Sequence, residues 1–354
     1  MTRILFRADA GAGVGLGHCV RSLALAVAAR DLGADCRLLV AGAEDSVGTH
    51  RLAAGSGFHI EFLEQVALGG REDFARTLAA ALRQGSDVVV VDSYRACGRY
   101  LEKLRAAGFV VLAIDDLAEE PFPCQIVVNG GAQASKLRYR SSSGDTCFLL
   151  GPHYALLRPQ FRGLPRRVVA PVAKNVLITL GSEDGRNVIP TLIATLGKLS
   201  EDLAMVAVLG PLIANRGEIE LATHACGDRV RLVNAPVSMR ELMLSADLAV
   251  AAGGQTTYEL AATGTPTVAI EVAANQAASL RALAQAGVLG LAGRASEPNV
   301  VERVKAAVRE LCHDASARQD MASCGQSLVD GWGALRVAQV LTGNRLSRPK
   351  AAVA

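Results

Sequence analysis

Short apolar runs alternate with helical patterns along almost the whole chain. In the first half most of these runs are nearly continuous Val, Ile and Leu, as is typical of strands buried on both faces of a parallel sheet. The runs that predict strands are 4–7, 36–40, 59–63, 87–91, 110–114 and 126–128, with amphipathic stretches at 18–32, 72–83 and 99–107. This alternation predicts an α/β fold with helices on both faces of the sheet.

The alternation pauses at 159–174, where three prolines stand among several arginines. We interpret this segment as a linker between a first domain at 1–158 and a second at 175–345. Two Rossmann-like halves are expected to face each other across a cleft, because open α/β sheets bind ligands at the carboxyl ends of their strands. The second series predicts strands at 176–180, 205–209, 230–233, 248–252 and 267–271, and later helices at 301–312, 315–328 and 334–341.

Composition and charge exclude several classes of protein. Half of the 354 residues are hydrophobic and 20% are charged, which rules out global disorder. The 37 basic and 34 acidic residues are too balanced for a phosphate-neutralising surface, so no nucleic-acid partner is expected. The eight cysteines form no CxxC pair, as is typical of reduced cytosolic thiols. No apolar run approaches the ~20 residues of a membrane span, and we expect a cytoplasmic protein.

A glycine-rich turn, GAGVGLGH at 11–18, follows the first predicted strand. It lacks the third glycine of the dinucleotide fingerprint and the Gly-Lys-Ser/Thr of a P-loop, which argues against an oxidoreductase. His18 stands at the helix N-terminus, where the helix dipole disfavours imidazolium. A neutral histidine at that position suits a general base. A histidine that merely caps the first turn remains the alternative.

A second glycine turn, Gly253 and Gly254, lies between a predicted strand and a helix. Glycines allow close backbone approach, and the exposed N–H groups of a first helical turn favour an anion. Gln255 and Thr256 supply further hydrogen-bond donors for a phosphate. Glu259, about one turn into the helix, is placed to accept hydrogen bonds from ribose hydroxyls.

A third glycine turn contains Gly181 and Ser182, after the first strand of the second half. Glycine turns occur at βα junctions of any such fold, so either turn alone carries little information. The two turns within one half favour a nucleotide diphosphate site over ordinary connections.

Two longer runs are distinctive. FRAD at 6–9 is followed by VGLGHCVRSLALA at 14–26, and YALLRPQF stands at 154–161. Shorter ones are VDSY at 91–94, DD at 115–116, VN at 128–129 and NQ at 275–276. As a set, over about residues 3–290, they resemble the UDP-sugar hydrolases of pseudaminic acid biosynthesis, which are two-domain nucleotide-sugar enzymes of the GT-B fold. The chain departs from that family's pattern at Ser93 and Leu180.

The resemblance implies hydrolysis of UDP-2,4-diacetamido-2,4,6-trideoxy-β-L-altrose to UDP and the free sugar. Water would attack the anomeric carbon with inversion, activated by His18. The resemblance implies no cofactor and no metal, in keeping with the absence of a D-x-D motif. We expect Asp115 and Asp116 to orient loops or substrate. The residues expected on the sugar side are Gly17, Arg21, Tyr94, Asn275 and Gln276, and those expected to bind UDP are Gly181, Ser182, Gly253, Gly254, Gln255, Thr256 and Glu259.

Two other functions fit the same residues. In a UDP-sugar glycosyltransferase of this fold, an acceptor hydroxyl would replace water beside His18. A nucleotide-sugar-binding subunit without turnover would not need His18 at all. Retention of His18 beside the glycine turn argues against that last function.

Overall fold

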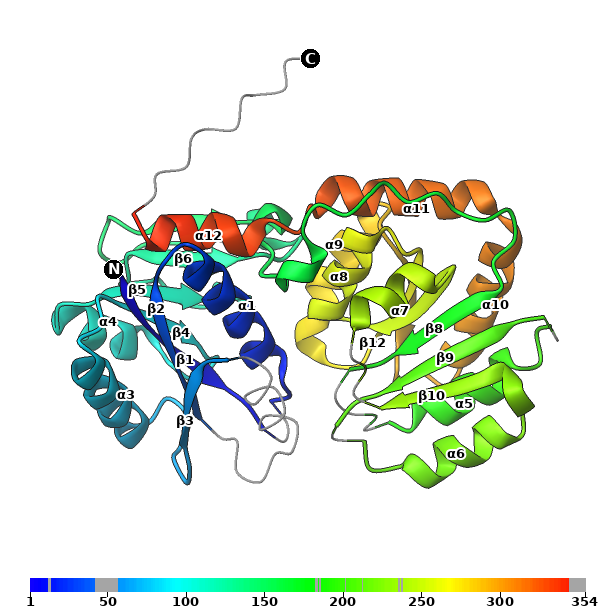
Figure 1. Cartoon of the computed structure of the whole chain (residues 1–354), viewed down its shortest axis with the longest axis horizontal. Helices are drawn as coiled ribbons and strands as arrows, with labels where there is room; N and C mark the ends of the chain where they lie inside the picture. The colour runs from blue at the N-terminus through cyan, green and yellow to red at the C-terminus, as the bar shows by residue number, and fades with distance from the viewer. Residues whose placement is uncertain are drawn as a thin grey trace, which may run out of the picture. The chain divides into compact units, whose positions relative to one another are not determined.

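The chain forms two compact units, Met1–Pro159 with the segment that begins at Gly331, and Gln160–Asp330. Each unit is a parallel sheet flanked by helices (Figure 1). The two parallel sheets confirm the predicted α/β class. The computed structural model describes residues 1–343 apart from 12–13, 42–56, 182–183, 185, 201, 212, 235 and 237.

The first unit contains a 7-stranded sheet in the order β3-β2-β1-β4-β5-β6-β7. Because strands added after β1 lie on both sides of it, β1 and β4 form a topological switch point, and open α/β sheets bind ligands at the carboxyl edge of such a point. The strands are β1 (Arg3–Asp9), β2 (Asp35–Ala41), β3 (His59–Leu63), β4 (Val88–Asp92), β5 (Val110–Ile114), β6 (Ile126–Asn129) and β7 (Cys147–Leu150). The helices are α1 (Gly17–Asp31), α3 (Arg71–Gln84), α4 (Gly98–Ala106) and α12 (Gly333–Leu341).

Strand β4 illustrates why these segments form central strands. Its sequence, VVVVD, is buried at every position. Successive side chains point to opposite faces, so Val90 joins one apolar cluster with Leu25 of α1, while Val89 joins another with Leu104 of α4. A strand covered on both faces needs apolar residues throughout, and only its last residue, Asp92, is charged.

The last helix departs from the predicted domain bounds, which placed it in the second domain. Helix α12 belongs to the first unit, where Ala334, Val337 and Leu341 join the same apolar cluster as Leu25 (Figure 1). Its amphipathic pattern predicts a helix, but the pattern does not name the partner of its apolar face. That partner is α1, the first helix of the chain.

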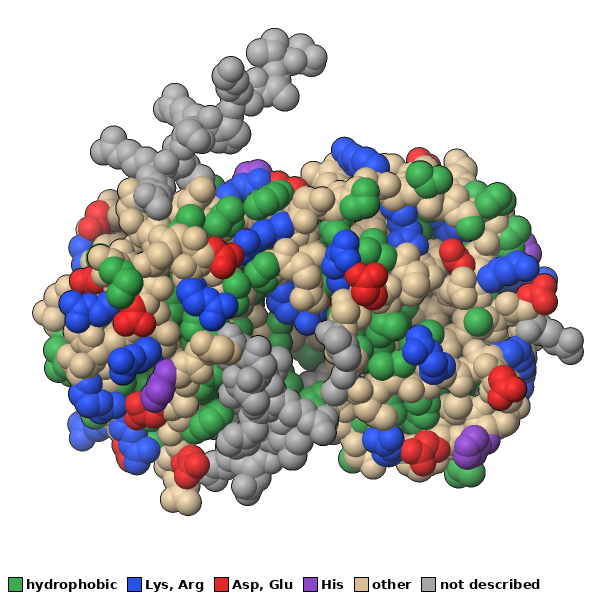
Figure 2. Space-filling view, in the orientation of Figure 1, with side chains coloured by type: hydrophobic (Ala, Val, Ile, Leu, Met, Phe, Trp, Pro, Cys, Tyr) green, Lys and Arg blue, Asp and Glu red, His purple; other side chains and the backbone are tan. Residues whose placement is uncertain are grey.

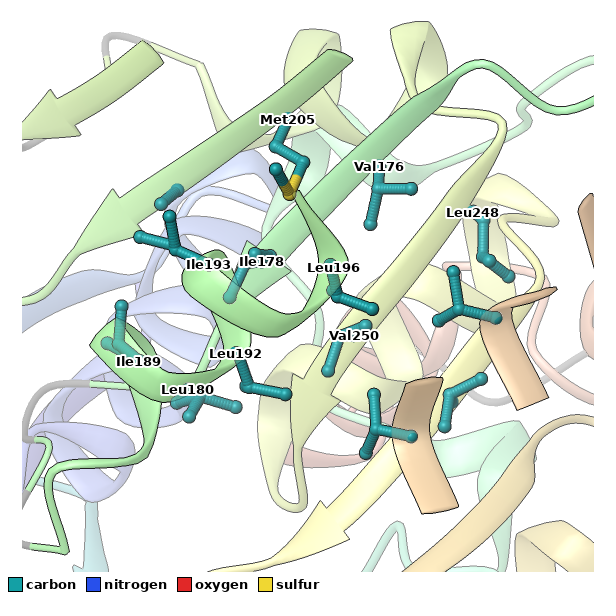
Figure 3. Close-up of a cluster of buried hydrophobic side chains, with 14 of the residues drawn as sticks. Val176, Ile178, Leu180, Ile189, Leu192, Ile193, Leu196, Met205, Leu248 and Val250 are labelled. Carbon is teal, nitrogen blue, oxygen red and sulfur yellow. The ribbon is translucent and has the colours of Figure 1, made fainter. Parts of the chain in front are cut away.

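The second unit contains a 6-stranded parallel sheet in the order β10-β9-β8-β11-β12-β13, with its switch point at β8 and β11. Figure 3 shows the apolar side chains of α5 packed against β8 and β11 in the core of this unit. The strands are β8 (Asn175–Thr179), β9 (Ala204–Leu209), β10 (Val230–Asn234), β11 (Leu248–Ala252), β12 (Thr267–Glu271) and β13 (Gly290–Arg294). The helices are α5 (Val188–Leu196), α6 (Arg216–His224), α7 (Met239–Ser245), α8 (Gln255–Thr263), α9 (Ala277–Gln285), α10 (Val300–His313) and α11 (Ala315–Leu328).

The segment interpreted as a linker is tied into the second unit. Arg318 of α11 is fully buried and donates to the backbone carbonyls of Leu311 and Cys312 at the end of α10, and to that of Ala170. Helix C-termini leave carbonyl groups without intrahelical partners, and a cation there is favoured by the helix dipole. Arg318 therefore holds part of 159–174 against the helical layer.

Charges on the surface are mixed. On the face shown in Figure 2, basic and acidic side chains are interspersed over the described residues. Among the helices of these residues, none has the length and apolar character needed to cross a membrane.

Candidate active site

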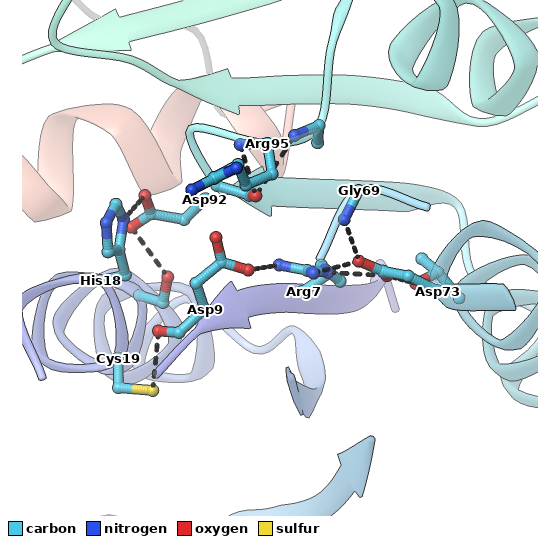
Figure 4. Close-up of polar contacts among 12 residues, drawn as sticks. Arg7, Asp9, His18, Cys19, Gly69, Asp73, Asp92 and Arg95 are labelled. Carbon is cyan, nitrogen blue, oxygen red and sulfur yellow. Dashed lines mark hydrogen bonds and ion pairs between the residues drawn. The ribbon is translucent and has the colours of Figure 1, made fainter. Parts of the chain in front are cut away.

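The first pair of the site joins α1 to the end of β4. His18, the second residue of α1, is 5% exposed, and its Nδ1 lies 2.5 Å from Oδ1 of Asp92 (Figure 4). The pair forms because Asp92 ends the strand beside β1, where it is the register partner of Ala8, and α1 begins shortly after β1 ends. The two residues therefore meet at the carboxyl edge of the switch point.

Arg21, one turn further along α1, keeps the carboxylate of Asp92 ionised. Its Nε and Nη2 donate to the two carboxylate oxygens of Asp92, each at 2.7 Å, in the bidentate geometry that arginine favours. Burial opposes ionisation of Asp92, but the charges and hydrogen bonds of Arg21 and His18 outweigh it and hold the pKa of Asp92 well below its usual range. An ionised Asp92 accepts from Nδ1–H of His18, which leaves Nε2 as the basic nitrogen.

A second short distance joins Arg21 to the ring of His18. Nη2 of Arg21 also lies 3.2 Å from Nδ1 of His18. Both atoms are donors when Nδ1 carries its proton, so this distance reflects their shared acceptor, Asp92, rather than a hydrogen bond between them. Within the described residues, Nε2 of His18 has no hydrogen-bond partner.

Asp116 extends the cluster to Tyr94. Its Oδ2 accepts from Nη1 of Arg21 at 2.7 Å and from the hydroxyl of Tyr94 at 2.6 Å. The Tyr94 ring packs edge-on against His18, with ring centroids 4.7 Å apart. Burial, followed by the charge of Asp116, raises the pKa of Tyr94, so its hydroxyl stays a donor at neutral pH. Arg21, expected on the substrate side, here donates from three nitrogens to two carboxylates.

Asp115 has a different environment from its neighbour Asp116. Its Oδ2 accepts from the backbone N–H groups of Leu117 and Ala118 at 2.9 and 2.8 Å, and from the hydroxyl of Tyr139 at 2.7 Å. These bonds shape the loop that follows β5. The two acids thus orient the loop and Tyr94, respectively. In the described part of the chain, no group of three or more His, Cys, Asp or Glu residues is arranged to hold a metal ion.

The FRAD run at the end of β1 forms a buried ion cluster. Arg7 is fully buried, pairs with Asp9 and Asp73, and its Nε donates to Oδ1 of Asp73 at 3.0 Å (Figure 4). Asp73 also accepts from the N–H of Gly69 at 2.7 Å, just before α3. Desolvation works against the cation, but the two carboxylates outweigh it and raise the pKa of Arg7. The cluster joins the end of β1 to the start of α3.

In the second unit, the glycine turn after β11 leads directly into the N-terminus of α8. Gly254 has φ of 109°, a backbone conformation that favours glycine, and a Cβ at this position would meet no protein atom within 4 Å. Among the described residues no side chain caps α8, and no acidic residue lies in its first turn, which begins with Gln255 and Thr256. These features suit an anion at the N-terminus of α8.

Two predicted residues meet beside this turn. A Cβ on Gly253 would lie 2.8 Å from Cβ of Gln276, so glycine is required for the close packing. Oε1 of Gln276 accepts from the N–H of Val272 at 3.0 Å. Asn275 is exposed in the same short turn, whereas Glu259, within α8, is 4% exposed and mostly packed inside the unit.

The turn after β8 differs because its helix is already capped. Asp184 accepts from the N–H groups of Val188 and Ile189, both at 2.9 Å, and so occupies the N-terminus of α5. Gly181 has φ of 97°. Ser182, predicted to bind UDP, lies outside the described residues.

Comparisons with known proteins give two distant relatives, and no family model matches the chain. It is 25% identical over 197 residues to the uncharacterised protein MJ1062 of Methanocaldococcus jannaschii, covering 52% of this chain and 40% of that protein. It is 24% identical over 204 residues to the spore coat polysaccharide biosynthesis protein SpsG of Bacillus subtilis, covering 56% and 59%. The chain spans about half the length of the curated relatives it matches.

Solved structures match over nearly the whole chain. MurG of Acinetobacter baumannii has a TM-score of 0.65 at 16% identity, covering 97% of this chain and 100% of that one. S. aureus MnaA with UDP has 0.66 at 13%, covering 99% of both. The spinosyn rhamnosyltransferase SpnG with thymidine diphosphate has 0.66 at 14%, covering 98% and 100%.

The chain has the GT-B fold. This confirms the predicted fold, while identities this low show the fold alone. Each unit of this GT-B chain brings together its own group of predicted residues. His18, Arg21 and Tyr94 come together in the first unit, and Gly253, Gly254 and Gln276 in the second.

Asp92 is a functional residue that sequence patterns alone do not single out, although it stands in the run VDSY. A signal for it exists, because a lone acid directly after four valines marks a strand end facing the switch point.

Proposed function

We propose that this protein is an enzyme that cleaves the bond between the anomeric carbon and the diphosphate of a UDP-sugar, with His18 as general base. The observation that carries the proposal is the His18–Asp92–Arg21 cluster, in which an ionised carboxylate orients a histidine at the edge of the sheet. A histidine that merely capped its helix would not need this support.

The proposed reaction follows from the hydrogen bond between ionised Asp92 and His18. Nε2 of His18 takes a proton from an attacking O–H group while the oxygen bonds to the anomeric carbon. The bond from that carbon to the diphosphate oxygen breaks, UDP leaves, and attack from the opposite side inverts the configuration. Asp92 stabilises the imidazolium that forms. One positioned base typically contributes a factor of about 10²–10⁴ in rate.

The second unit is the proposed holder of UDP. The open N-terminus of α8, with Gly254, Gln255 and Thr256, suits the diphosphate, and its partial positive charge stabilises the departing anion. Glu259 is the proposed ribose ligand. Gly181 and Ser182 are weaker candidates, because Asp184 occupies the helix beyond their turn.

Two nucleophiles are compatible with this mechanism, and different findings support them. An acceptor hydroxyl, which makes the protein a glycosyltransferase, is supported by the similar structures, since SpnG and SsfS6 of Streptomyces are glycosyltransferases. Water, which makes it a hydrolase of the UDP-linked diacetamido sugar in pseudaminic acid biosynthesis, is supported by the runs at 6–26 and 154–161.

The deciding experiment measures UDP release from UDP-2,4-diacetamido-2,4,6-trideoxy-β-L-altrose, without acceptor, by wild type and His18→Ala. His59→Ala is the matched control, because His59 is an exposed histidine of the same unit. Fast release lost only in His18→Ala supports the hydrolase.

Calorimetric titration with UDP accompanies the assay, and His18→Ala is expected to bind UDP as wild type does. If UDP binds without release, the assay is repeated with sugar acceptors, and release that depends on an acceptor supports the transferase. Binding without release under every condition contradicts the enzymatic proposal.

A further inference from the structure

A cavity lies beside Tyr94 in the first unit. Its volume is about 340 Å³, at the lower end of the range of ligand pockets, which suits a sugar-sized group better than a nucleotide. It lies where β4 and β5 end and α4 begins. The lining residues are Val91, Ser93, Tyr94, Ala96, Cys97, Gly98, Leu101, Ala113, Ile114, Asp115, Leu117, Glu119, Glu120 and Phe122.

The lining combines apolar side chains with acidic groups. Half of these residues have aliphatic or aromatic hydrocarbon side chains, whereas Asp115, Glu119 and Glu120 are acidic. None of the described lining residues is Lys, Arg or His. Oε1 of Glu120 accepts from the N–H of Gly98 at 2.7 Å. A phosphate or carboxylate would meet acidic lining residues with no basic lining residue beside them. An apolar group would instead displace water from the apolar part of the lining.

Tyr94 connects the cavity to the base. One Tyr94 side chain both lines the cavity and packs edge-on against His18, with ring centroids 4.7 Å apart. Its hydroxyl donates to Oδ2 of Asp116 at 2.6 Å, which orients the ring. A group in the cavity can therefore contact the same side chain that packs against His18.

We propose that this cavity binds a neutral, partly apolar substituent of the sugar and selects against sugars that carry a carboxylate. The inference rests on the proposed function, since it assumes that the anomeric carbon of a UDP-sugar lies near His18. It adds a specificity site formed by the loops after β4 and β5, separate from the UDP-binding turn.

Cys97 provides a direct test, because it is an exposed free thiol on the cavity lining. Alkylation of the native protein is followed by mass spectrometry in the presence of UDP, UDP-N-acetylglucosamine or UDP-glucuronate. Cys147 and Cys324, which are exposed but do not line the cavity, are the internal controls. We expect UDP-N-acetylglucosamine to slow labelling of Cys97 in proportion to the bound fraction, and UDP alone to leave it unchanged.

A variant that reverses the charge of one lining residue tests the selection against carboxylates. Glu119→Lys is expected to raise the affinity for UDP-glucuronate about tenfold relative to UDP, equivalent to about 1.4 kcal/mol. Glu102→Lys, an exposed position of α4 off the lining, should not.

The outcomes separate the two proposals. If UDP binds and UDP-N-acetylglucosamine protects Cys97 no better than UDP does, the cavity inference is overturned while the proposed function stands. If UDP-glucuronate protects Cys97 as well as UDP-N-acetylglucosamine, the charge selection is overturned. If UDP itself does not bind, the proposed function fails and the inference fails with it.

Discussion

The carboxyl edges of the two sheets differ in chemistry although both sheets are parallel and both have a switch point. In the first unit the strand ends carry acids, with Asp92 as the last residue of β4 and Asp115 and Asp116 directly after β5. In the second unit β11 is followed by Gly253 and Gly254. Acids suit a site that orients and moves protons, and a glycine turn that leads into a helix without an acid in its first turn suits a diphosphate. One architecture thus serves two tasks through the residues that follow its strands.

The two glycine turns of the second unit also differ. Both contain a glycine with positive φ, Gly181 and Gly254. The helix after Gly181 is capped by Asp184, whereas the helix after Gly254 has no side-chain cap from the part of the chain that the structure describes. A glycine turn alone therefore does not identify a phosphate site, and the residue at the helix N-terminus decides.

The largest expected effect comes from the acidic edge. Asp92→Asn removes the charge that orients His18 and stabilises its imidazolium, and should lower kcat by about 10²–10⁴ with an unchanged Kd for UDP. Steady-state kinetics and calorimetry measure the two quantities. Asp87→Asn, at the opposite end of the same strand and exposed, is the control and should keep full activity. An active Asp92→Asn enzyme would contradict the proposed role of the pair.

The second effect concerns the open turn. Gly254→Ala places a side chain at φ of 109°, which costs about 1–3 kcal/mol, and projects it where the diphosphate is proposed to lie. UDP affinity should fall about tenfold or more, measured by calorimetry. Gly217→Ala, in α6 and with open space around its Cβ, should leave UDP affinity unchanged. Equal UDP binding by Gly254→Ala and wild type would exclude this turn as the phosphate site.

The capped turn should respond in stability instead. Asp184→Ala removes the cap of α5 and should lower the free energy of unfolding by about 1 kcal/mol, with an unchanged Kd for UDP. Thermal unfolding and calorimetry measure both. The opposite pattern, lost UDP binding at unchanged Tm, would move the phosphate site to the turn after β8.

The smallest effect is a pH dependence. The pKa of Asp92 is lowered in the folded chain, so its ionised form stabilises the fold above the ordinary aspartate value of about 3.9. That contribution is lost as the pH falls below this value and through the lower folded pKa. Urea unfolding of wild type and Asp92→Asn between pH 6 and 2 should therefore show a stability difference that shrinks in acid. A constant difference would mean that Asp92 is not ionised in the fold.

Much of the fold could be predicted from hydrophobic runs, because central strands such as β4 are apolar at nearly every position. The strands β7 and β13 were not predicted. Strand β7 has only four residues, and β13, GLAGR, contains two glycines, which weaken the strand signal. Both form at sheet edges, where pairing with a neighbouring strand adds to a weak local preference.

The sequence predicts only those parts of the site that depend on local patterns. The positions of His18 and of the Gly254 turn follow from local patterns. Asp92 lies 74 residues beyond His18 in the sequence, and their contact depends on the β1–β4 register. The capping of α5 by Asp184 likewise requires a turn geometry that glycine spacing does not specify.

The pairing of α12 with α1 has a consequence for the folding of the chain during its synthesis on the ribosome. The first unit is discontinuous in sequence, since it needs Gly333–Leu341 after the whole of the second unit has been made. On the ribosome the second unit has all of its residues available first, while the apolar surface of α1 waits for its last helix. A chain that stops near residue 330 retains every residue assigned here to chemistry, yet it lacks the helix that completes the unit containing His18.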